Sequence, residues 1–337
     1  MRAWIFAPAL ALVLATAAAA CVGDDPVGSQ DAGATPADAS TAPTDAPTNV
    51  PDTSTPVPDA GADTSAPRDG AVDTGTDRRC DPAKTFDAPT FMATVSSAFD
   101  EASFSMTRDE LTAFMHRENT GAPNTSLLQT TRARVTDAFA APTETNLAVV
   151  NTPPGSEYSP TVSPDGLVLY FHRQTAGGIG VFVATRGAAG APFANQGAVT
   201  VGGTALSDAL SPHLSADGQT LYWLDFQTFK LHQAARGATP AIFGTGREVT
   251  PADVYNPVLS ADELTLYYSN GMSDDVLRAT RASKAASFGA GVRVDALSSN
   301  AKDAPLFLTG DGCVMILKST RPGGSGGTDL WMAQRPQ

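Results

Sequence analysis

The sequence has few cysteines and, over much of its first quarter, few of the residues that build a folded core. Only three cysteines occur in 337 residues, and residues 22–79 contain no Lys, no Glu and almost no large apolar side chain. That segment is mostly Asp, Pro, Thr, Ala, Ser and Gly, with 11 Asp against three Arg. Such a composition cannot bury enough apolar surface to offset the entropy of ordering. We therefore expect a disordered linker over residues 21–79 and one large all-β domain over residues 80–337.

Positive charge is also scarce. The formal net charge is −13, and Lys and Arg do not cluster anywhere along the chain. Nucleic-acid binding requires a basic patch, and an anionic lipid surface attracts clusters of basic residues. The sequence therefore predicts no nucleic-acid partner and no electrostatic attachment to a membrane.

The N-terminus begins with a short leader. Arg2 precedes an apolar run over residues 5–20, which is too short and too rich in Ala for a membrane-spanning helix. The run ends in three Ala directly before Cys21, and small residues ahead of a Cys resemble the lipobox of bacterial lipoproteins. The resemblance implies that residues 1–20 are a signal peptide and that Cys21 carries a lipid anchor. The alternative is ordinary signal cleavage after small residues, with Cys21 free of lipid.

An anchor of several alkyl chains holds a protein stably on a membrane. We therefore expect an exported protein tethered in the cell envelope by residues 21–79. Val22, rather than Asp, follows Cys21, which by resemblance to enterobacterial sorting favours the outer membrane. The folded domain would then face the periplasm or the cell surface.

The two other cysteines, Cys80 and Cys313, lie at the start and near the end of the expected domain. Leftover cysteines of an exported chain usually pair in an oxidising compartment. Their spacing fits no zinc site, which needs ligands two to four residues apart. We predict a Cys80–Cys313 disulfide that joins the ends of the domain; the alternative is two separate thiols.

Internal repeats are the clearest signal in the chain. The pattern Ser-Pro-x-x-Ser-x-Asp-Gly-x-x-Leu-Tyr-Phe recurs, with substitutions, in residues 159–171, 211–223, 256–268 and 304–317, and a degenerate copy occupies residues 103–115. The repeated Asp residues are Asp109, Asp165, Asp217, Asp262 and Asp311. A second motif follows each copy and ends in Arg132, Arg186, Arg236, Arg281 and Arg335. Five motif pairs predict five structural repeats.

Each repeat is typical of short antiparallel strands. Pro opens a strand, Asp-Gly or Asp-Glu makes a hairpin turn, and the apolar run that follows is buried on both faces. Four such strands per repeat describe a propeller blade. We therefore predict an all-β fold, a five-bladed β-propeller of four-stranded antiparallel blades. The aromatic residues that recur after each turn, such as Tyr170 and Tyr222, are expected between the blades.

The sequence also predicts how the propeller ring closes. The chain stops soon after the third strand of its last repeat, and residues 88–97 are similar to the variable fourth strand of other repeats. We predict that this N-terminal strand completes the last blade. A disulfide between Cys80 and Cys313 would lock the closure.

The repeat pattern resembles the TolB-type, WD-like β-propeller repeat over residues 86–337. Proteins of that family act in the bacterial envelope as interaction platforms. Because the propeller is joined to an anchor and a tether and the sequence lacks a catalytic set, we expect a non-enzymatic protein that binds an envelope protein or a glycan, and we expect it to be a monomer. The N-terminal α/β domain of TolB is missing here, because the linker occupies its place. The alternative is a propeller enzyme, a hydrolase or lyase acting on glycans at the central channel.

The sequence shows no catalytic set, no metal site and no cofactor motif. The repeated Asp residues are interpreted as turn residues that bond their own backbone. A calcium site would need several converging oxygens, and its loop spacing is absent. Residues 323–327 match G-x-S-x-G, but a nucleophile elbow requires a strand before it and a helix after it, so we interpret them as a hairpin loop.

His116 and His172 each lie seven residues after a repeated Asp, at equivalent strand ends of adjacent repeats. We expect solvated or hydrogen-bonded imidazoles there, with a two-His metal site as the alternative. The five repeated Arg residues are expected to form structural ion pairs or to lie on the rim. A ring of Arg facing a ligand is the alternative.

Overall fold

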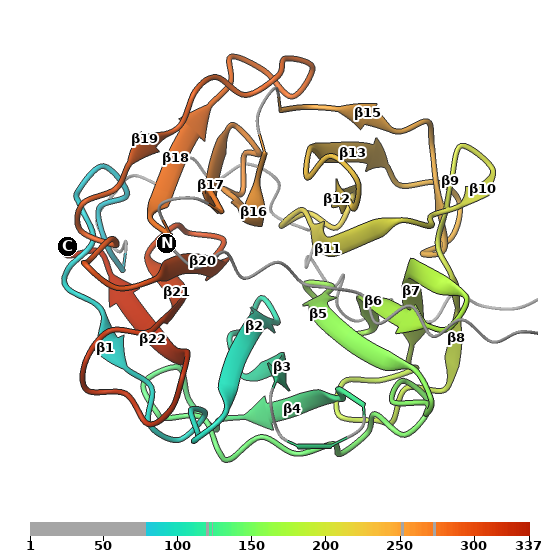
Figure 1. Cartoon of the computed structure of the whole chain (residues 1–337), viewed down its shortest axis with the longest axis horizontal. Helices are drawn as coiled ribbons and strands as arrows, with labels where there is room; N and C mark the ends of the chain where they lie inside the picture. The colour runs from blue at the N-terminus through green and yellow to red at the C-terminus, as the bar shows by residue number, and fades with distance from the viewer. Residues whose placement is uncertain (1–78, 119–120, 123, 251–252, 272–273) are drawn as a thin grey trace, which may run out of the picture. The chain divides into compact units, whose positions relative to one another are not determined.

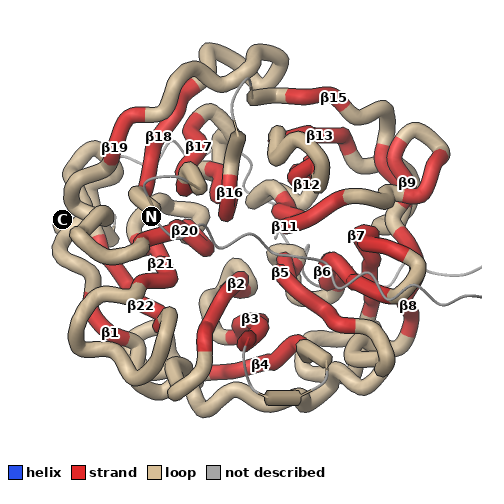
Figure 2. Tube along the Cα trace, in the orientation of Figure 1, coloured by secondary structure: helices blue, strands red, loops and turns tan. Residues whose placement is uncertain are grey.

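The computed structural model describes residues 79–118, 121–122, 124–250, 253–271 and 274–337. The predicted signal peptide, Cys21 and the predicted linker up to residue 78 lie outside the described residues. The described part of the chain consists of strands, turns and loops and contains no α-helix (Figure 2). It therefore offers no helix long and apolar enough to span a membrane.

The fold is an all-β propeller of six blades with three or four strands each (Figure 1). Five blades carry the repeated motif, and we number them in chain order. From the axis outward, their strands are β2 (Asp100–Met106), β3 (Thr112–Glu118) and β4 (Leu127–Thr131) in blade 1; β5 (Ser156–Val162), β6 (Val168–Thr175), β7 (Gly178–Thr185) and β8 (Asn195–Ala198) in blade 2; β11 (Ala209–Leu214), β12 (Thr220–Asp225), β13 (Leu231–Ala235) and β15 (Arg247–Glu248) in blade 3; β16 (Tyr255–Leu259), β17 (Thr265–Ser269), β18 (Val276–Thr280) and β19 (Val292–Arg293) in blade 4; and β20 (Asp303–Leu308), β21 (Val314–Ser319), β22 (Asp329–Gln334) and β1 (Thr90–Phe91) in blade 5.

The sixth blade, which we call the rim blade, lies at the outer edge between blades 2 and 3 (Figure 1). Its strands are β10 (Thr204–Ala205), β9 (Thr200–Val201) and β14 (Ile242–Phe243). The prediction of five blades was therefore wrong. The strands of the rim blade are only two residues long and lie in segments without the repeated motif, so counting the motif does not reveal this blade. The rim blade forms because β14 pairs in parallel with β9, across about 40 residues of chain.

The prediction of uniform four-stranded antiparallel blades was wrong as well. Blade 1 and the rim blade have three strands each, and the pairing of β9 with β14 is parallel. In blade 1, Gln129 of β4 pairs with Thr143 in an isolated bridge, where the other motif blades have a fourth strand. The repeat therefore predicts the three inner strands of each blade better than it predicts the outermost one.

The N-terminal strand closes the ring. In β1, Thr90 pairs with Met332 and Phe91 with Trp331 of β22, so residues at the two ends of the domain share blade 5. A disulfide joins Cys80 to Cys313, and both cysteines are buried. The first and last parts of the described chain are thus linked by backbone pairing and by a covalent bond.

The core lies between neighbouring blades. Tyr170 of β6 packs with Leu221 and Trp223 of blade 3, and Tyr222 packs with Leu266 of blade 4. Tyr170 and Tyr222 are fully buried, as predicted. Each large apolar side chain removed from water contributes roughly 1.5–3 kcal/mol. The repeated aromatic positions therefore hold the ring together.

Candidate functional site

The repeated Asp residues make the hairpin turns between the first two strands of the motif blades. The Ser163 hydroxyl donates to Asp165 Oδ1 at 2.6 Å, and the Leu167 N–H donates to the same oxygen at 3.0 Å. The Ser163 oxygen also accepts the N–H of Val168 at 2.9 Å. The same three bonds recur around Asp109, Asp217, Asp262 and Asp311. We call the end of the ring that carries these turns the turn face.

Local hydrogen bonding lowers the pKa of the turn carboxylates in blades 2 to 5. Burial raises the pKa of Asp165, but the bonds from Ser163 and Leu167 outweigh it and lower the pKa overall. The balance has the same direction at Asp217, Asp262 and Asp311. Each of these carboxylates is therefore committed to its own turn.

The repeated Arg residues hold the same turns. Arg186 Nε donates to the Gly166 carbonyl at 2.7 Å, and its guanidinium lies 4.8 Å from the ring centre of Phe193. Arg132 and Arg281 donate in the same way to the carbonyls of Glu110 and Glu263, and Arg236 donates through Nη1 to the carbonyl of Gly218. Arg132 and Arg281 also stack on Phe139 and Phe288. These Phe residues follow their Arg by seven positions, a regularity that was visible in the sequence and that sequence reasoning missed.

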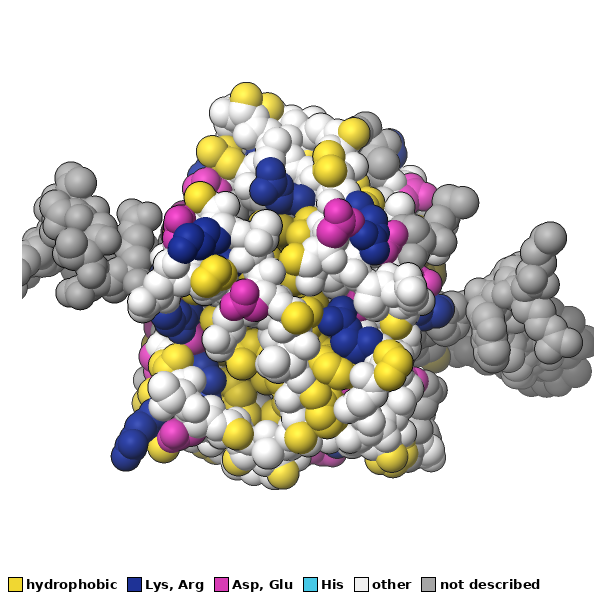
Figure 3. All heavy atoms as spheres, turned by 90° about the vertical axis from the view of Figure 1, so that its left-hand side faces the viewer, with side chains coloured by type: hydrophobic (Ala, Val, Ile, Leu, Met, Phe, Trp, Pro, Cys, Tyr) yellow, Lys and Arg dark blue, Asp and Glu magenta, His cyan; other side chains and the backbone are white. Residues whose placement is uncertain are grey.

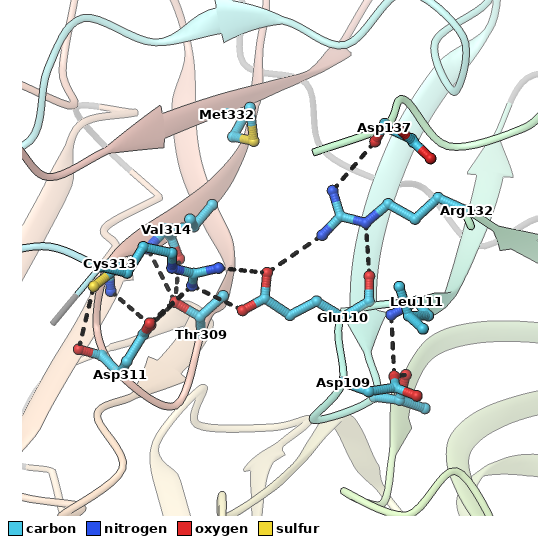
Figure 4. A network of polar contacts seen from close by, with 12 residues as sticks. Asp109, Glu110, Leu111, Arg132, Asp137, Thr309, Asp311, Cys313, Val314 and Met332 are labelled. Carbon is cyan, nitrogen blue, oxygen red and sulfur yellow. Dashed lines mark hydrogen bonds and ion pairs between the residues drawn. The ribbon is translucent and has the colours of Figure 1, made fainter. Parts of the chain in front are cut away.

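In blade 1 a Glu carboxylate lies beside the repeated Arg (Figure 4). Glu110 takes a left-handed conformation, with φ of 60°, at the turn position where blades 2, 3 and 5 have Gly. Its carboxylate lies 3.3 Å from Arg132 and accepts two hydrogen bonds from Arg79, whose guanidinium also pairs with Asp311 at 2.9 Å. We call the place beside the repeated Arg, which Glu110 fills here, the carboxylate position.

In blade 4 the carboxylate is connected to the repeated Arg through the hydroxyl of a tyrosine. Glu263 has a φ of 59° and is fully buried, and its carboxylate accepts a 2.6 Å hydrogen bond from the Tyr222 hydroxyl of blade 3. Lys284 pairs with the same carboxylate, and Arg281 donates to the Tyr222 oxygen at 2.7 Å. Glu110 and Glu263 therefore both contact groups of the preceding blade or of the closing segment.

Two small cavities lie along the ring axis, with volumes of about 50 and 80 Å³. The first is lined by the innermost strands of the five motif blades, including Ser103, Ser159, Ser211 and Asn256. The second lies toward the turn face, beside Arg108 and Ser215. Among the described residues, the lining of both cavities includes no Asp and no Glu. The axis therefore has room for a few water molecules and carries no carboxylate pair.

The two equivalent histidines link neighbouring blades. His116 Nδ1 accepts the N–H of Ser159 at 3.2 Å, and His172 Nδ1 accepts the N–H of Ser211 at 3.4 Å. Tyr158 lies between them, stacked on His172 and edge-on to His116. Burial lowers the pKa of His116 and lowers that of His172 to about 3. Both imidazoles are therefore neutral acceptors near neutral pH.

The metal-site alternative finds no support in this geometry. The Nδ1 atoms of His116 and His172 are occupied by backbone N–H groups. Within the described ranges, no group of three or more His, Cys, Asp or Glu is placed to hold a metal ion.

Ser103, His116 and Glu118 form a hydrogen-bonded chain that resembles the order of a hydrolytic triad. Ser103 Oγ lies 2.6 Å from His116 Nδ1, and His116 Nε2 lies 3.1 Å from Glu118 Oε1. However, Nδ1 also accepts the Ser159 N–H, so a proton taken from Ser103 would break that bond. The cavity beside Ser103 is also too small for an acyl substrate. The chain of bonds therefore satisfies buried polar groups.

Residues 323–327 form the loop between β21 and β22, as the sequence indicates. The Asp329 carboxylate accepts the N–H groups of Ser325 and Gly326 at 2.9 and 3.2 Å. A strand, not a helix, follows this loop. Ser325 is therefore held in a hairpin and not on a nucleophile elbow.

The largest of the cavities described here is a groove of about 710 Å³ on the turn face. It crosses blades 1, 2 and 3 and is lined by the turns of Asp109, Asp165 and Asp217. Three basic side chains also line it, Arg108, Arg186 and Arg236. By contrast, the side of the ring with β1 and β19 mixes basic, acidic and hydrophobic side chains over its described surface (Figure 3). We take the groove as the candidate binding site, because its volume is that of a typical ligand pocket.

No protein-family model matches the chain, and no curated protein matches its sequence. Solved structures do match its fold. The GH43_1 enzyme from Xanthomonas citri, complexed with xylotriose, is 14% identical, covers 73% of this chain and 89% of its own, and superposes with a TM-score of 0.52. Regucalcin from Agrobacterium tumefaciens is 12% identical over 75% of this chain and 96% of its own, with a TM-score of 0.44. TolB from Acinetobacter baumannii is 12% identical over 71% of this chain and 56% of its own, with a TM-score of 0.40.

Identities of 14% and below indicate a shared fold and nothing finer. The sheet topology and the match to the GH43_1 structure agree that the chain has a β-propeller fold.

Proposed function

We propose that the chain is an exported lipoprotein of the bacterial envelope whose propeller binds an envelope protein or a glycan and catalyses no reaction. The observation that carries the proposal is the groove of about 710 Å³, which brings Arg108, Arg186 and Arg236 to one open surface. Pockets of this size that contain a few charged groups orient and select ligands. The anchor is supported by Cys21 and the small residues before it, and the linker supplies the tether.

A propeller enzyme acting on glycans is the alternative, because the GH43_1 structure was solved with xylotriose. Glycoside hydrolysis uses two carboxyl groups roughly 5–10 Å apart on either side of the scissile bond. The axial cavities of about 50 and 80 Å³ have no carboxylate among their described lining residues. The carboxylates that do line the groove are committed to hairpin turns. These observations favour binding over catalysis.

Photo-crosslinking in intact cells tests the binding function. Gln219 is exposed and lines the groove, so a benzoylphenylalanine in its place should give a reproducible adduct with one partner. The matched control is the same replacement at Val292, which is 71% exposed on β19 and outside the groove. No adduct from residue 219, or the same adduct from both positions, would contradict the proposal. Turnover of aryl glycosides by the purified protein would contradict the absence of catalysis.

The anchor is tested separately. Replacing Cys21→Ala should move the protein from the membrane fraction to the soluble fraction, because the only predicted attachment is the lipid. Unchanged membrane retention would refute lipidation.

A further inference from the structure

The carboxylate positions beside the repeated Arg residues are not all filled. Blades 1 and 4 fill theirs with Glu110 and Glu263. In blade 5, Arg335 instead donates to the backbone carbonyls of residues 82 and 84 in the N-terminal segment. Blades 2 and 3 have Gly at this point of the turn, Gly166 and Gly218, so no side chain of the turn enters the position. Two adjacent carboxylate positions therefore remain open, and their Arg residues line the groove.

The backbone at the open positions is suited to a carboxylate. Gly166 and Gly218 have φ of 74° and 73°, close to the 60° of Glu110. A Cβ on Gly166 would be crowded, at 3.0 Å from Thr107 Cγ2 and 3.2 Å from Arg186 Nη2, whereas a Cβ on Gly218 would lie at an ordinary 3.8 Å from Arg236 Nη1. A side chain at residue 218 would thus project toward the repeated Arg without a clash, as Glu110 does in blade 1. By analogy with Glu110, the group that suits each open position is a carboxylate.

The charge at the open positions is only partly compensated. Asp165 interacts electrostatically with Arg186 and Arg236, but neither Arg forms an ion pair with any described residue, whereas Arg132 pairs with Glu110. Arg186 is only 6% exposed, and its two hydrogen bonds go to the backbone carbonyls of Gly166 and Ala191. A buried guanidinium without a directly bonded counter-ion is unfavourable, and a carboxylate is the anion that its planar donors bind best.

The turn Asp residues do not exclude a carboxylate from these positions. Asp109 precedes Glu110 in the filled position of blade 1, and Asp262 precedes Glu263 in that of blade 4. In both cases the Asp uses Oδ1 for its own turn, as Asp165 and Asp217 do beside the open positions. The molecule therefore already holds a second carboxylate next to a turn Asp twice.

We propose that the groove binds a carboxylate-bearing ligand, whose acidic groups occupy the two open positions beside Arg186 and Arg236. This inference rests on the proposed binding function and names the chemistry of the ligand. The filled positions hold Glu side chains, so the ligand that we propose is an acidic peptide segment of a protein partner. A glycan that contains uronic acid is a distinct outcome of the test. The Glu110 carboxylate in Figure 4 shows how such a group is held when the chain supplies it.

The replacement Gly218→Glu tests the proposal, because it supplies the carboxylate from within the chain. The probes are an oligo-aspartate and an oligogalacturonate, with oligo-asparagine and a neutral oligosaccharide as their uncharged counterparts, and the readout is the Kd by calorimetry. We expect the oligo-aspartate to bind the full-length protein in low salt. Gly218→Glu should weaken that binding at least about tenfold, the loss expected when a charged hydrogen bond is blocked.

Two matched controls separate charge from backbone effects. Gly218→Ala adds a Cβ at the same φ without a carboxylate, and Gly312→Glu adds a carboxylate at a turn whose Arg is covered by the N-terminal segment. Both variants should bind the acidic probes as the wild type does. If Gly218→Glu does not fold, Arg236→Gln provides the test, since it removes the charge and keeps an N–H donor; it should weaken binding to a similar degree.

The outcomes separate this inference from the proposed function. Binding of the oligo-aspartate supports an acidic peptide as the ligand, whereas binding of the oligogalacturonate alone would contradict the peptide and point to a glycan. Failure of both acidic probes to bind, or equal binding by wild type and Gly218→Glu, would overturn the carboxylate site. A partner crosslinked from residue 219 equally well with and without Gly218→Glu would leave the binding function standing and reject the carboxylate site. No adduct in any variant would contradict the binding function itself.

Discussion

Two parts of the turn face use the same motif for different purposes. Where blades 5 and 1 meet, Glu110 lies beside Arg132 (Figure 4) and pairs with Arg79, which also pairs with Asp311. Across blades 1 to 3, the same turns and the repeated Arg186 and Arg236 line an open groove. The repeated Arg residues of the closing part are covered, by Glu110 in blade 1 and by the N-terminal segment in blade 5, whereas those of the groove have only Gly beside them. The same turn can therefore stabilise the ring or form part of a binding surface. The outcome depends on whether another part of the chain covers its repeated Arg.

The two parts also differ in how their blades are joined. Arg79 and Asp311 are 232 residues apart, so the closing contact must offset the entropy of closing the whole ring. It does so with an ion pair, a strand and the Cys80–Cys313 disulfide. Beneath the groove, successive blades are linked by uncharged hydrogen bonds near the axis. These are Val162 N–H to Ser105 Oγ, Leu214 N–H to Thr161 Oγ1, and the bonds to His116 and His172.

The largest expected effect concerns the closing part. Replacing Cys80→Ser and Cys313→Ser together should lower the free energy of unfolding by about 2–5 kcal/mol, because the disulfide closes a very long loop. Urea unfolding measures the change, and reductant should destabilise the wild type but not the double variant. The groove should keep its affinity for an acidic probe. Loss of that affinity in the folded double variant would show that ring closure and ligand binding in the groove are coupled. It would contradict the separation of the two parts.

The next effect concerns the histidine links beneath the groove. His172 has a folded pKa of about 3, lowered by burial, with a further lowering by His116 and a small opposing effect of Glu118. Its contribution to stability is therefore complete above the unfolded pKa of about 6.5 and is lost as the pH falls from there toward 3. The loss approaches about 1.4 kcal/mol per pH unit within that window.

The replacement His172→Asn keeps a side-chain acceptor but cannot titrate. It should reduce the acid sensitivity of unfolding between pH 6.5 and pH 5, as measured by urea midpoints across that range. His232→Asn on β13 is the matched control, because His232 is partly exposed and accepts no hydrogen bond from the next blade among the described residues. Identical pH profiles for wild type and His172→Asn would reject the link.

The smallest expected effect is that of the exposed ion pair at the closing part. Arg79 is 37% exposed, so Arg79→Ala should lower the free energy of unfolding by no more than about 1 kcal/mol, and less in high salt. Urea midpoints in low and high salt give the test. A salt-independent loss of several kcal/mol would mean that Arg79, and not the disulfide, dominates closure.

The motif blades could be predicted because each one needs the same turn and the same buried run. The turn of Asp165 and the packing of Tyr170 require only neighbours in the motif and the next blade, so one repeat predicts the others. The closing strand β1 was predictable because the last repeat lacks its fourth strand. The rim blade was not, because β9 and β14 are two residues long and pair only after blades 2 and 3 are in place.

The candidate site was only partly predictable. The alternation of Glu and Gly after the repeated Asp can be read in the sequence, but its meaning depends on where the Arg186 guanidinium lies. His116 and His172 were expected at equivalent positions, and the structure shows what the sequence could not, that each accepts an N–H of the next blade. The blade number was wrong for the same reason: it depends on contacts that no repeated residue encodes.

The most direct test of the account is a crystal structure of the propeller with the tighter-binding acidic probe. The account predicts a carboxylate of the probe in the groove, hydrogen-bonded to the guanidinium of Arg186 or Arg236 as Glu110 is to Arg132. A probe bound at the ring axis, or a groove whose Arg residues remain free of the probe at saturation, would contradict it.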